Sequence, residues 1–320
     1  MKILFITSSR IGDAVLSSGL LDHLMARYPR AYFTVACGPA AAPLFAAAPR
    51  VERIIVMNKR KWAGHWFDLW WDCIRQPWGW GMVVDLRSSI IAQLLIARRR
   101  RVYRGRAGGR HRLYSLAKTL KLSDPPSPVL WTGPHHETEA ARLILEGGPV
   151  LALGPTANWA GKIWPADNFS ELARRLTAPD SGILPGARIA VFGAAAERDI
   201  AQPVLDAFAG DRLIDLVGTA ELPTIAACLS RCALFIGNDS GLMHMAAAAG
   251  APTLGLFGPS QDEIYAPWGA QTALVRTTIP YEELFPPGNR ALDSLMDSLS
   301  VDAVEAAAGD LWARCESATD

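Results

Sequence analysis

One stretch, from Phe235 to Ser260, constrains the fold most, because it joins a strand, a polar turn, a helix and a second strand. Residues 237–241 (GNDSG) are of the types that tolerate unusual backbone angles or cap helices. Residues 242–249 then predict a helix of small side chains, which Gly-Ala-Pro at 250–252 ends. The apolar residues 253–257 predict the next strand. This order of elements indicates an α/β fold.

The turn in this stretch suits an anion. A helix start has free N–H groups and the positive end of the helix dipole, and here Ser240 and Gly241 lie at that start. The alternative is an ordinary strand–turn–helix in which Asp239 or Ser240 serves only as the helix N-cap. Both interpretations remain open at this point.

Length and charge together predict two domains. A chain of 320 residues exceeds the usual size of one domain. Residues 1–150 carry 22 Lys and Arg against 10 Asp and Glu, whereas residues 151–320 carry 10 against 21, which gives +12 and −11. We therefore expect one half to meet something anionic. The Glu-Gly-Gly-Pro sequence at 146–149 interrupts the pattern, so the predicted domains are 1–148 and 149–320.

Strand and helix patterns alternate in both halves, which predicts parallel sheets covered by helices on both faces. The predicted strands are residues 2–7, 32–36, 53–56, 82–86, 150–153, 188–192, 213–217, 233–236 and 253–257. The predicted helices include one that ends near Tyr28 and those at residues 168–177, 197–209, 222–231, 242–249 and 301–314.

We expect a cytoplasmic protein with free thiols. No apolar run reaches the roughly 18 residues of a membrane helix. The apolar start at residues 2–6 is too short for a secretory signal, since Arg10 and Asp13 follow at once. The 5 cysteines are an odd number without CxxC spacing, which favours free, mostly buried thiols.

Three motifs together resemble the heptosyltransferase family, glycosyltransferase family 9. They are SSRIGD at residues 8–13, KIWP at 162–165, and DSGLMH at 239–244, the last followed by GAPT and FGPS. The resemblance spans nearly the whole chain and is weakest between about residues 56 and 112. It implies a GT-B fold, with two Rossmann-like domains facing each other across a cleft and the C-terminal helix packed back on the first domain.

The resemblance also implies an activity: inverting transfer of heptose from ADP-heptose onto a lipopolysaccharide core precursor. One alternative is a family member that uses another nucleotide sugar or polysaccharide acceptor. Another is a non-catalytic GT-B protein that binds lipid or a nucleotide sugar. A nicotinamide dehydrogenase is disfavoured, because the turn at residues 7–13 lacks GxGxxG.

The first motif implies the acceptor side of the reaction. Glycosyl transfer needs a base for the acceptor hydroxyl, and a carboxylate suits that task. Asp13 follows the first strand and matches the family's proposed base, although an Asp at a helix start is often only a cap. Gly12 lets the backbone approach the substrate closely, and Ser9 and Arg10 are predicted to bind the acceptor.

The other two motifs imply the donor side. Lys162 would face the donor diphosphate, where positive charge stabilises the leaving group, although a lone surface lysine is usually only solvated. His244, which alone would suggest a packed helix histidine, would contact the diphosphate or the sugar. Asp239 would bind the sugar hydroxyls. The remaining predicted donor-binding residues are Thr156, Asn158, Ser240 and Gly241.

We predict no metal and no cofactor. The chain offers no Asp-x-Asp pair placed like a metal-binding motif, so lysine and helix N–H groups would replace a cation. The run His135-His136-Glu137 has no further ligand in the sequence, and it is interpreted as the polar start of a helix.

The basic half contains eight arginines between residues 98 and 112, including Arg98 and Arg101. Such a run is most often a solvated face, but here we predict contact with an anionic lipid-linked acceptor, not with nucleic acid. Nearby, Trp62, Trp66 and Trp70 share one helical face. Either they dock at the cytoplasmic face of the inner membrane, or they fill core between helices.

Overall fold

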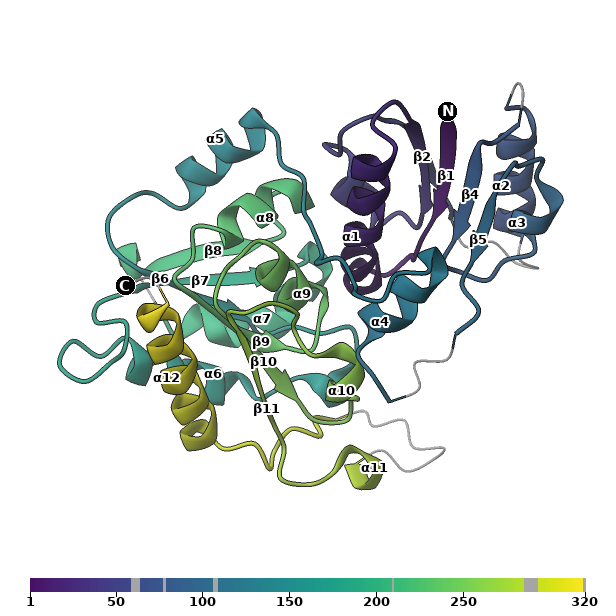
Figure 1. The fold of residues 1–320 in the computed structure, drawn as a ribbon. Coiled ribbons are helices and arrows are strands. Elements are labelled where there is room, and N and C mark those ends of the chain that lie inside the picture. The colour runs from purple at the N-terminus through teal and green to yellow at the C-terminus, as the bar shows by residue number, and fades with distance from the viewer. Residues whose placement is uncertain (59–63, 77–78, 106–108, 209, 285–292, 319–320) are drawn as a thin grey trace. The chain divides into compact units, whose positions relative to one another are not determined.

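A computed structural model describes residues 1–58, 64–76, 79–105, 109–208, 210–284 and 293–318. The chain divides into two compact units, Met1–Gly133 and Pro134–Asp320 (Figure 1). The division lies earlier than the predicted 148/149, because helix α5 (Pro134–Leu143) packs against α8 (Leu222–Leu229) of unit 2. Each unit is described by itself.

Unit 1 is built on a five-stranded parallel sheet in the order β3-β2-β1-β4-β5. Its strands are β1 (Lys2–Ile6), β2 (Tyr32–Cys37), β3 (Val51–Val56), β4 (Met82–Asp85) and β5 (Arg100–Val102). Its helices are α1 (Ile11–Arg27), α2 (Gly64–Ile74), α3 (Ile91–Leu94) and α4 (Arg112–Ala117), with short 3-10 turns η1 (Ala42–Phe45) and η3 (Lys118–Leu120).

Unit 2 is built on a six-stranded parallel sheet in the order β11-β10-β9-β6-β7-β8. Its strands are β6 (Val150–Gly154), β7 (Arg188–Gly193), β8 (Leu213–Val217), β9 (Leu234–Asn238), β10 (Thr253–Phe257) and β11 (Thr272–Arg276). Its further helices are α6 (Ala166–Leu176), α7 (Arg198–Asp206), α9 (Gly241–Ala248), α10 (Asp262–Tyr265), α11 (Tyr281–Leu284) and α12 (Val301–Ser317), with 3-10 turns η4 (Ala160–Lys162), η5 (Ala195–Glu197) and η6 (Gly210–Arg212).

Both sheets follow the Rossmann strand order, as predicted. In each unit the first strand has its sequence successor on one side and a later strand on the other: β1 lies between β2 and β4, and β6 between β7 and β9. In such open parallel sheets a crevice forms at the carboxyl ends of the two strands where the order reverses. The crevices therefore lie beyond the pairs Ile6–Asp85 and Gly154–Gly237.

The C-terminal helix belongs to the core of unit 2. Helix α12 packs against α6, β10 and β11. Its apolar positions explain this, because Val304, Ala308, Leu311 and Cys315 are buried in the same core cluster as Phe169 of α6.

The tryptophan-rich helix has two different faces. Trp66 and Trp70 of α2 pack against the core of unit 1, so the core interpretation is correct for these two residues, while Trp62 lies outside the described residues. On the adjacent face, Phe67, Trp71 and Ile74 are exposed. Among the helices that the structure describes, none has the length and apolar character needed to cross a membrane.

Candidate functional site

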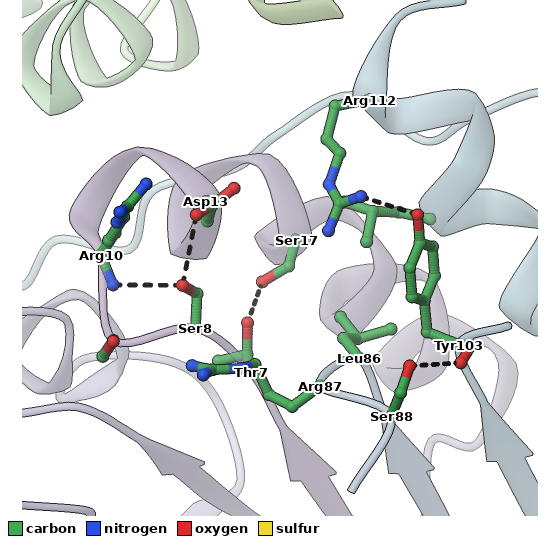
Figure 2. A pocket seen from close by; sticks show the side chains of 12 residues that line it. Thr7, Ser8, Arg10, Asp13, Ser17, Leu86, Arg87, Ser88, Tyr103 and Arg112 are labelled. Atoms are coloured by element: carbon green, nitrogen blue, oxygen red, sulfur yellow. Dashed lines mark hydrogen bonds between the residues drawn. The ribbon is translucent and has the colours of Figure 1, made fainter. Parts of the chain in front are cut away.

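Unit 1 carries a pocket of about 400 Å³ at the crevice between β1 and β4 (Figure 2). The loop after β1 and the start of α1 form one wall, and the segments after β4 and β5 form the others. The residues that line it are Thr7, Ser8, Ser9, Arg10, Asp13, Ser17, Leu86, Arg87, Ser88, Tyr103, Arg112 and Leu116.

Asp13 lies in this pocket and does not cap its helix. The N-cap of α1 is Arg10, which makes no capping hydrogen bond through its side chain. Asp13 Oδ2 instead accepts a long hydrogen bond of 3.4 Å from Ser8 Oγ (Figure 2). Among the described residues, no Lys, Arg or His forms an ion pair with Asp13. The carboxylate is thus available to accept a proton from a bound molecule.

A buried carboxylate shapes the opposite wall. Asp85, the last residue of β4, accepts hydrogen bonds of 2.7 Å from the backbone N–H groups of Arg87 and Ser89. Ser88 between them has a left-handed backbone (φ 55°), and its hydroxyl donates to the Tyr103 carbonyl at 2.6 Å. This tight turn directs Arg87 and Ser88 to the pocket, a role that the sequence analysis missed.

Arg112 is the most firmly placed cation of the pocket. Its NH1 group donates to the Tyr103 hydroxyl at 2.7 Å, and its guanidinium carbon lies 4.8 Å from the centre of the same ring. Its Nε is buried with no hydrogen-bond partner among the described residues. A buried guanidinium N–H without a partner is costly, so it suits an anionic ligand in the pocket.

The predicted acceptor residues divide into two groups. Ser9 and Arg10 line the pocket, whereas Gly12 lies beside it in α1 without lining it. Arg98 and Arg101 also do not line it: Arg98 is exposed just before β5, and Arg101 donates to the neighbouring Arg100 carbonyl. The last arginine of the run, Arg112, does line the pocket.

In unit 2, Lys162 and Asp239 meet at the crevice between β6 and β9. Lys162 Nζ lies 2.5 Å from Asp239 Oδ2, and their side chains are 23% and 7% exposed. Lys162 comes from η4 in the loop after β6, and Asp239 follows β9 directly. Lys162 is also the only lysine in the sequence after Lys121. The second and third predicted motifs therefore converge, as a common donor site requires.

Asn238 holds these two loops together. Its side chain is buried, with Nδ2 donating to the Pro155 carbonyl at 2.9 Å and Oδ1 accepting from the Trp164 N–H at 3.1 Å. The residue before it, Gly237, permits the close approach of the strands, because a Cβ there would lie 2.9 Å from the Gly154 oxygen. The sequence analysis placed Asn238 in the turn without assigning it this role.

Two predicted donor residues of the β6 loop have different surroundings. The Thr156 hydroxyl is buried and donates to Glu197 Oε2 at 2.8 Å, and the same oxygen accepts from the Ala194 N–H at 3.0 Å. Thr156 therefore fixes its loop to the loop after β7. Asn158, in contrast, is exposed.

The start of α9 has the character of an anion site. Ser240 is the N-cap, yet its side chain caps no N–H group, and its Oγ is buried without a partner in the described parts of the chain. Gly241 begins the helix, so its N–H is one of the groups without an intrahelical acceptor. His244 is 5% exposed one turn further on. The hydroxyl and the N–H groups are available to the same ligand.

Glu221, which is distant in sequence, lies beside the histidine pair at 135–136. Both residues lie in the first turn of α5, as the predicted helix start requires. Glu221, just before α8, places Oε1 at 3.0 Å from His136 Nε2 and 3.7 Å from His135 Nε2. The expectation that no further ligand stands near this pair was wrong, because α5 packs on α8.

Comparison with known proteins identifies the family. The sequence model of glycosyltransferase family 9 (heptosyltransferase) matches residues 86–285 of this chain. The chain belongs to this family. Lipopolysaccharide heptosyltransferase 2 of Salmonella typhimurium is 26% identical, with 89% of this chain and 90% of that protein covered.

Solved structures agree on the fold of this family 9 glycosyltransferase. The structure of Escherichia coli ADP-heptose lps heptosyltransferase II matches 99% of this chain and 100% of its own at 21% identity, with a TM-score of 0.75. A glycosyltransferase family 9 structure from Veillonella parvula matches 98% and 97% at 19% identity, with a TM-score of 0.80. The GT-B fold expected from the sequence is thereby confirmed.

Proposed function

We propose that this family 9 glycosyltransferase moves heptose from ADP-heptose onto a lipopolysaccharide core precursor, with inversion at the anomeric carbon. The proposal is supported by family membership and by heptosyltransferase relatives that align over most of the chain. The observation that carries it is Asp13, a carboxylate without an ion-pair partner among the described residues, in a pocket lined mainly by hydroxyl-bearing side chains and arginines.

Asp13 acts as the general base. Its free carboxylate oxygen takes the proton of the attacking acceptor hydroxyl, whose oxygen then bonds to the anomeric carbon. The bond from that carbon to the diphosphate oxygen breaks on the opposite face, and ADP leaves with the electron pair. The Ser8 hydroxyl, 3.4 Å from Oδ2, orients the carboxylate.

The leaving diphosphate is held by unit 2. Lys162 supplies a positive charge, while Ser240 Oγ and the N–H of Gly241 donate hydrogen bonds to the phosphate oxygens. His244 contacts the diphosphate or the sugar. Asp239, oriented by Lys162, accepts hydrogen bonds from sugar hydroxyls.

Two further predicted donor residues, Asn158 and Thr156, belong to the loop after β6. The exposed Asn158 amide contacts the diphosphate from the β6 loop, while Thr156 positions that loop through Glu197. Since a lysine and helix N–H groups neutralise the leaving group, the proposed reaction uses no cofactor and no metal.

The acceptor is anionic in this proposal. Arg87 and Arg112 bind its acidic groups within the pocket, and Ser9 and Arg10 complete that wall. Arg98, exposed, and Arg101 lie outside the pocket and meet negative charge further along the acceptor.

We further propose that unit 1 docks on the cytoplasmic face of the inner membrane, where a lipid-linked acceptor is held. Phe67, Trp71 and Ile74 form an exposed apolar stripe on α2, and the Arg75 guanidinium lies 4.5 Å from the Trp71 ring centre. Aromatic and basic side chains together favour an anionic membrane surface. In liposome flotation, we expect binding that rises with anionic lipid and falls in Trp71→Ala; lipid-independent behaviour would reject this docking.

The activity is tested by ADP release from ADP-heptose with heptose-deficient lipopolysaccharide as acceptor. Wild type should turn over only with acceptor, and Asp13→Asn should be about 10² to 10⁴ times slower. The control is Asp22→Asn, which changes an acid of the same helix outside the pocket and should keep its rate.

The other outcomes separate the alternatives. A folded wild type without turnover would reject this donor–acceptor pair and leave another nucleotide sugar, or a non-catalytic binding protein, as the explanation. An Asp13→Asn variant with full turnover would refute the base assignment while keeping the activity.

A further inference from the structure

We propose that His135, His136 and Glu221 form a binding site for a divalent transition metal of the zinc class, which fastens the first turn of α5 to the start of α8. This site is separate from the residues proposed for glycosyl transfer, and the inference does not depend on that function. It rests on the position and chemistry of the three side chains in unit 2.

The spacing of the three donor atoms fits one small cation. His136 Nε2 lies 3.0 Å and His135 Nε2 lies 3.7 Å from the same oxygen, Glu221 Oε1. One potential ligand atom from each residue lies within 4.8 Å of the others. Zinc binds imidazole nitrogen and carboxylate oxygen at about 2.0–2.2 Å in a tetrahedron, which separates neighbouring ligand atoms by roughly 3.3 Å. The two distances to Glu221 Oε1, 3.0 Å and 3.7 Å, lie just below and just above this separation.

A simple ion pair explains the arrangement less well. One protonated histidine would satisfy Glu221 Oε1, yet two imidazoles converge on it, with ring centres only 3.6 Å apart. Two imidazolium rings in contact would repel each other, whereas a dication is held by two neutral imidazoles and a carboxylate. Two histidines with one glutamate are also a known zinc ligand set, which leaves the fourth position to water.

The surroundings support a built site. The His136 side chain is only 4% exposed, so its ring is held in place, while His135 and Glu221 at 72% and 52% leave a path for a metal ion. Glu221 is the N-cap residue of α8, yet its side chain makes no capping hydrogen bond. Thr224 of α8 also donates to Glu139 of α5 at 2.9 Å, which keeps the two helices in register.

The cysteines offer little competition. All 5 are buried and none forms a disulfide, and burial raises the pKa of Cys37, Cys73 and Cys228 to about 12. Thiols bind zinc as thiolates, so these groups remain poor ligands in the folded chain. Zinc added to the native protein should therefore report on the histidine site.

The test is zinc titration of the full chain, freed of any histidine tag and stripped with EDTA, in competition with a chromophoric chelator. We expect one zinc ion per wild-type chain, with affinity lost or reduced by at least about tenfold in His135→Ala and in Glu221→Gln. Both side chains are half exposed or more, so these variants should fold. His23→Ala removes a histidine of α1 in unit 1 and should bind zinc like wild type.

A second readout tests the fastening of the helices. A metal that binds only the folded chain must raise its melting temperature, and that rise should vanish in His135→Ala. Absence of zinc binding by wild type, or equal binding by the His135 and Glu221 variants, would overturn the site. Zinc bound at this site without any rise in melting temperature would overturn the fastening role.

Discussion

Asp13 of unit 1 and Asp239 of unit 2 both lie where the strand order of their sheets reverses, Asp13 beyond β1 and Asp239 beyond β9, yet their surroundings differ. Within the described part of the chain, the Asp13 carboxylate accepts a hydrogen bond from one side chain, the Ser8 hydroxyl at 3.4 Å, whereas Asp239 is 7% exposed and lies 2.5 Å from the Lys162 ammonium. Asp239 is therefore already engaged by a cation of its own unit, whereas the Asp13 carboxylate faces the pocket of unit 1. The comparison teaches that one sheet topology can hold both the weakly hydrogen-bonded carboxylate that we propose as the base and the ion-paired carboxylate that we propose as the sugar-binding acid.

On the unit 2 side of this comparison, the largest expected effect comes from replacing Lys162. In Lys162→Ala the diphosphate loses its cation, and we expect kcat to fall by about 10² to 10³, as for other lost groups that stabilise developing charge. The same change leaves Asp239 buried without its partner, so the melting temperature should also fall.

A double variant separates these two effects. Lys162→Ala with Asp239→Asn removes the unpaired charge, so the stability should recover while the rate stays low. If the double variant regains wild-type turnover, Lys162 serves the fold and not the leaving group.

The next effect concerns acceptor binding in unit 1. Arg112→Ala removes the buried guanidinium, and we expect the KM for acceptor to rise about 10- to 100-fold, because hydrogen bonds to charged groups contribute about 1.5–3 kcal/mol. The KM for ADP-heptose should not change. Arg110→Ala is the control, since Arg110 is exposed, lies outside the pocket and stacks on Tyr114. Equal effects of the two variants would indicate a general charge effect.

The smallest effect tests the loops that hold the two sites. Gly38 follows β2, and Gly193 ends β7, the strand in the equivalent place of the other sheet. A Cβ at Gly38 would lie 2.4 Å from Ser9 Cβ, whereas one at Gly193 would lie 3.4 Å from Thr156 Cγ2. We expect Gly38→Ala to lower the free energy of unfolding by about 1–3 kcal/mol. Gly193→Ala should be neutral or slightly stabilising. Chemical denaturation of both variants measures the difference, and equal values would contradict the predicted crowding at Ser9.

The sequence predicted what is encoded locally. The strand at Thr253–Phe257 has the predicted bounds, and most other elements differ by one or two residues at their ends, because hydrophobic period and turn residues mark them. The motifs likewise placed Asp13 just beyond β1 and Lys162 in the loop after β6, because each motif is a short continuous segment.

Side chains brought together by the sheet order could not be predicted in this way. Arg87 reaches the Asp13 pocket because β4 lies beside β1, and Asn238 joins two loops because β9 lies beside β6. Glu221 approaches the histidine pair through helix packing across 85 residues of sequence. For α12, the apolar stripe was visible, but the surface that it covers depends on the tertiary fold.

The central claim is that unit 1 supplies the base and unit 2 holds the donor. The most direct test is calorimetric measurement of ADP-heptose binding to wild type, Asp13→Asn and Lys162→Ala, beside their turnover. We expect Asp13→Asn to keep the wild-type donor affinity while its turnover falls about 10² to 10⁴-fold, and Lys162→Ala to bind the donor more weakly. An Asp13→Asn variant that loses donor affinity as severely as turnover would contradict the claim.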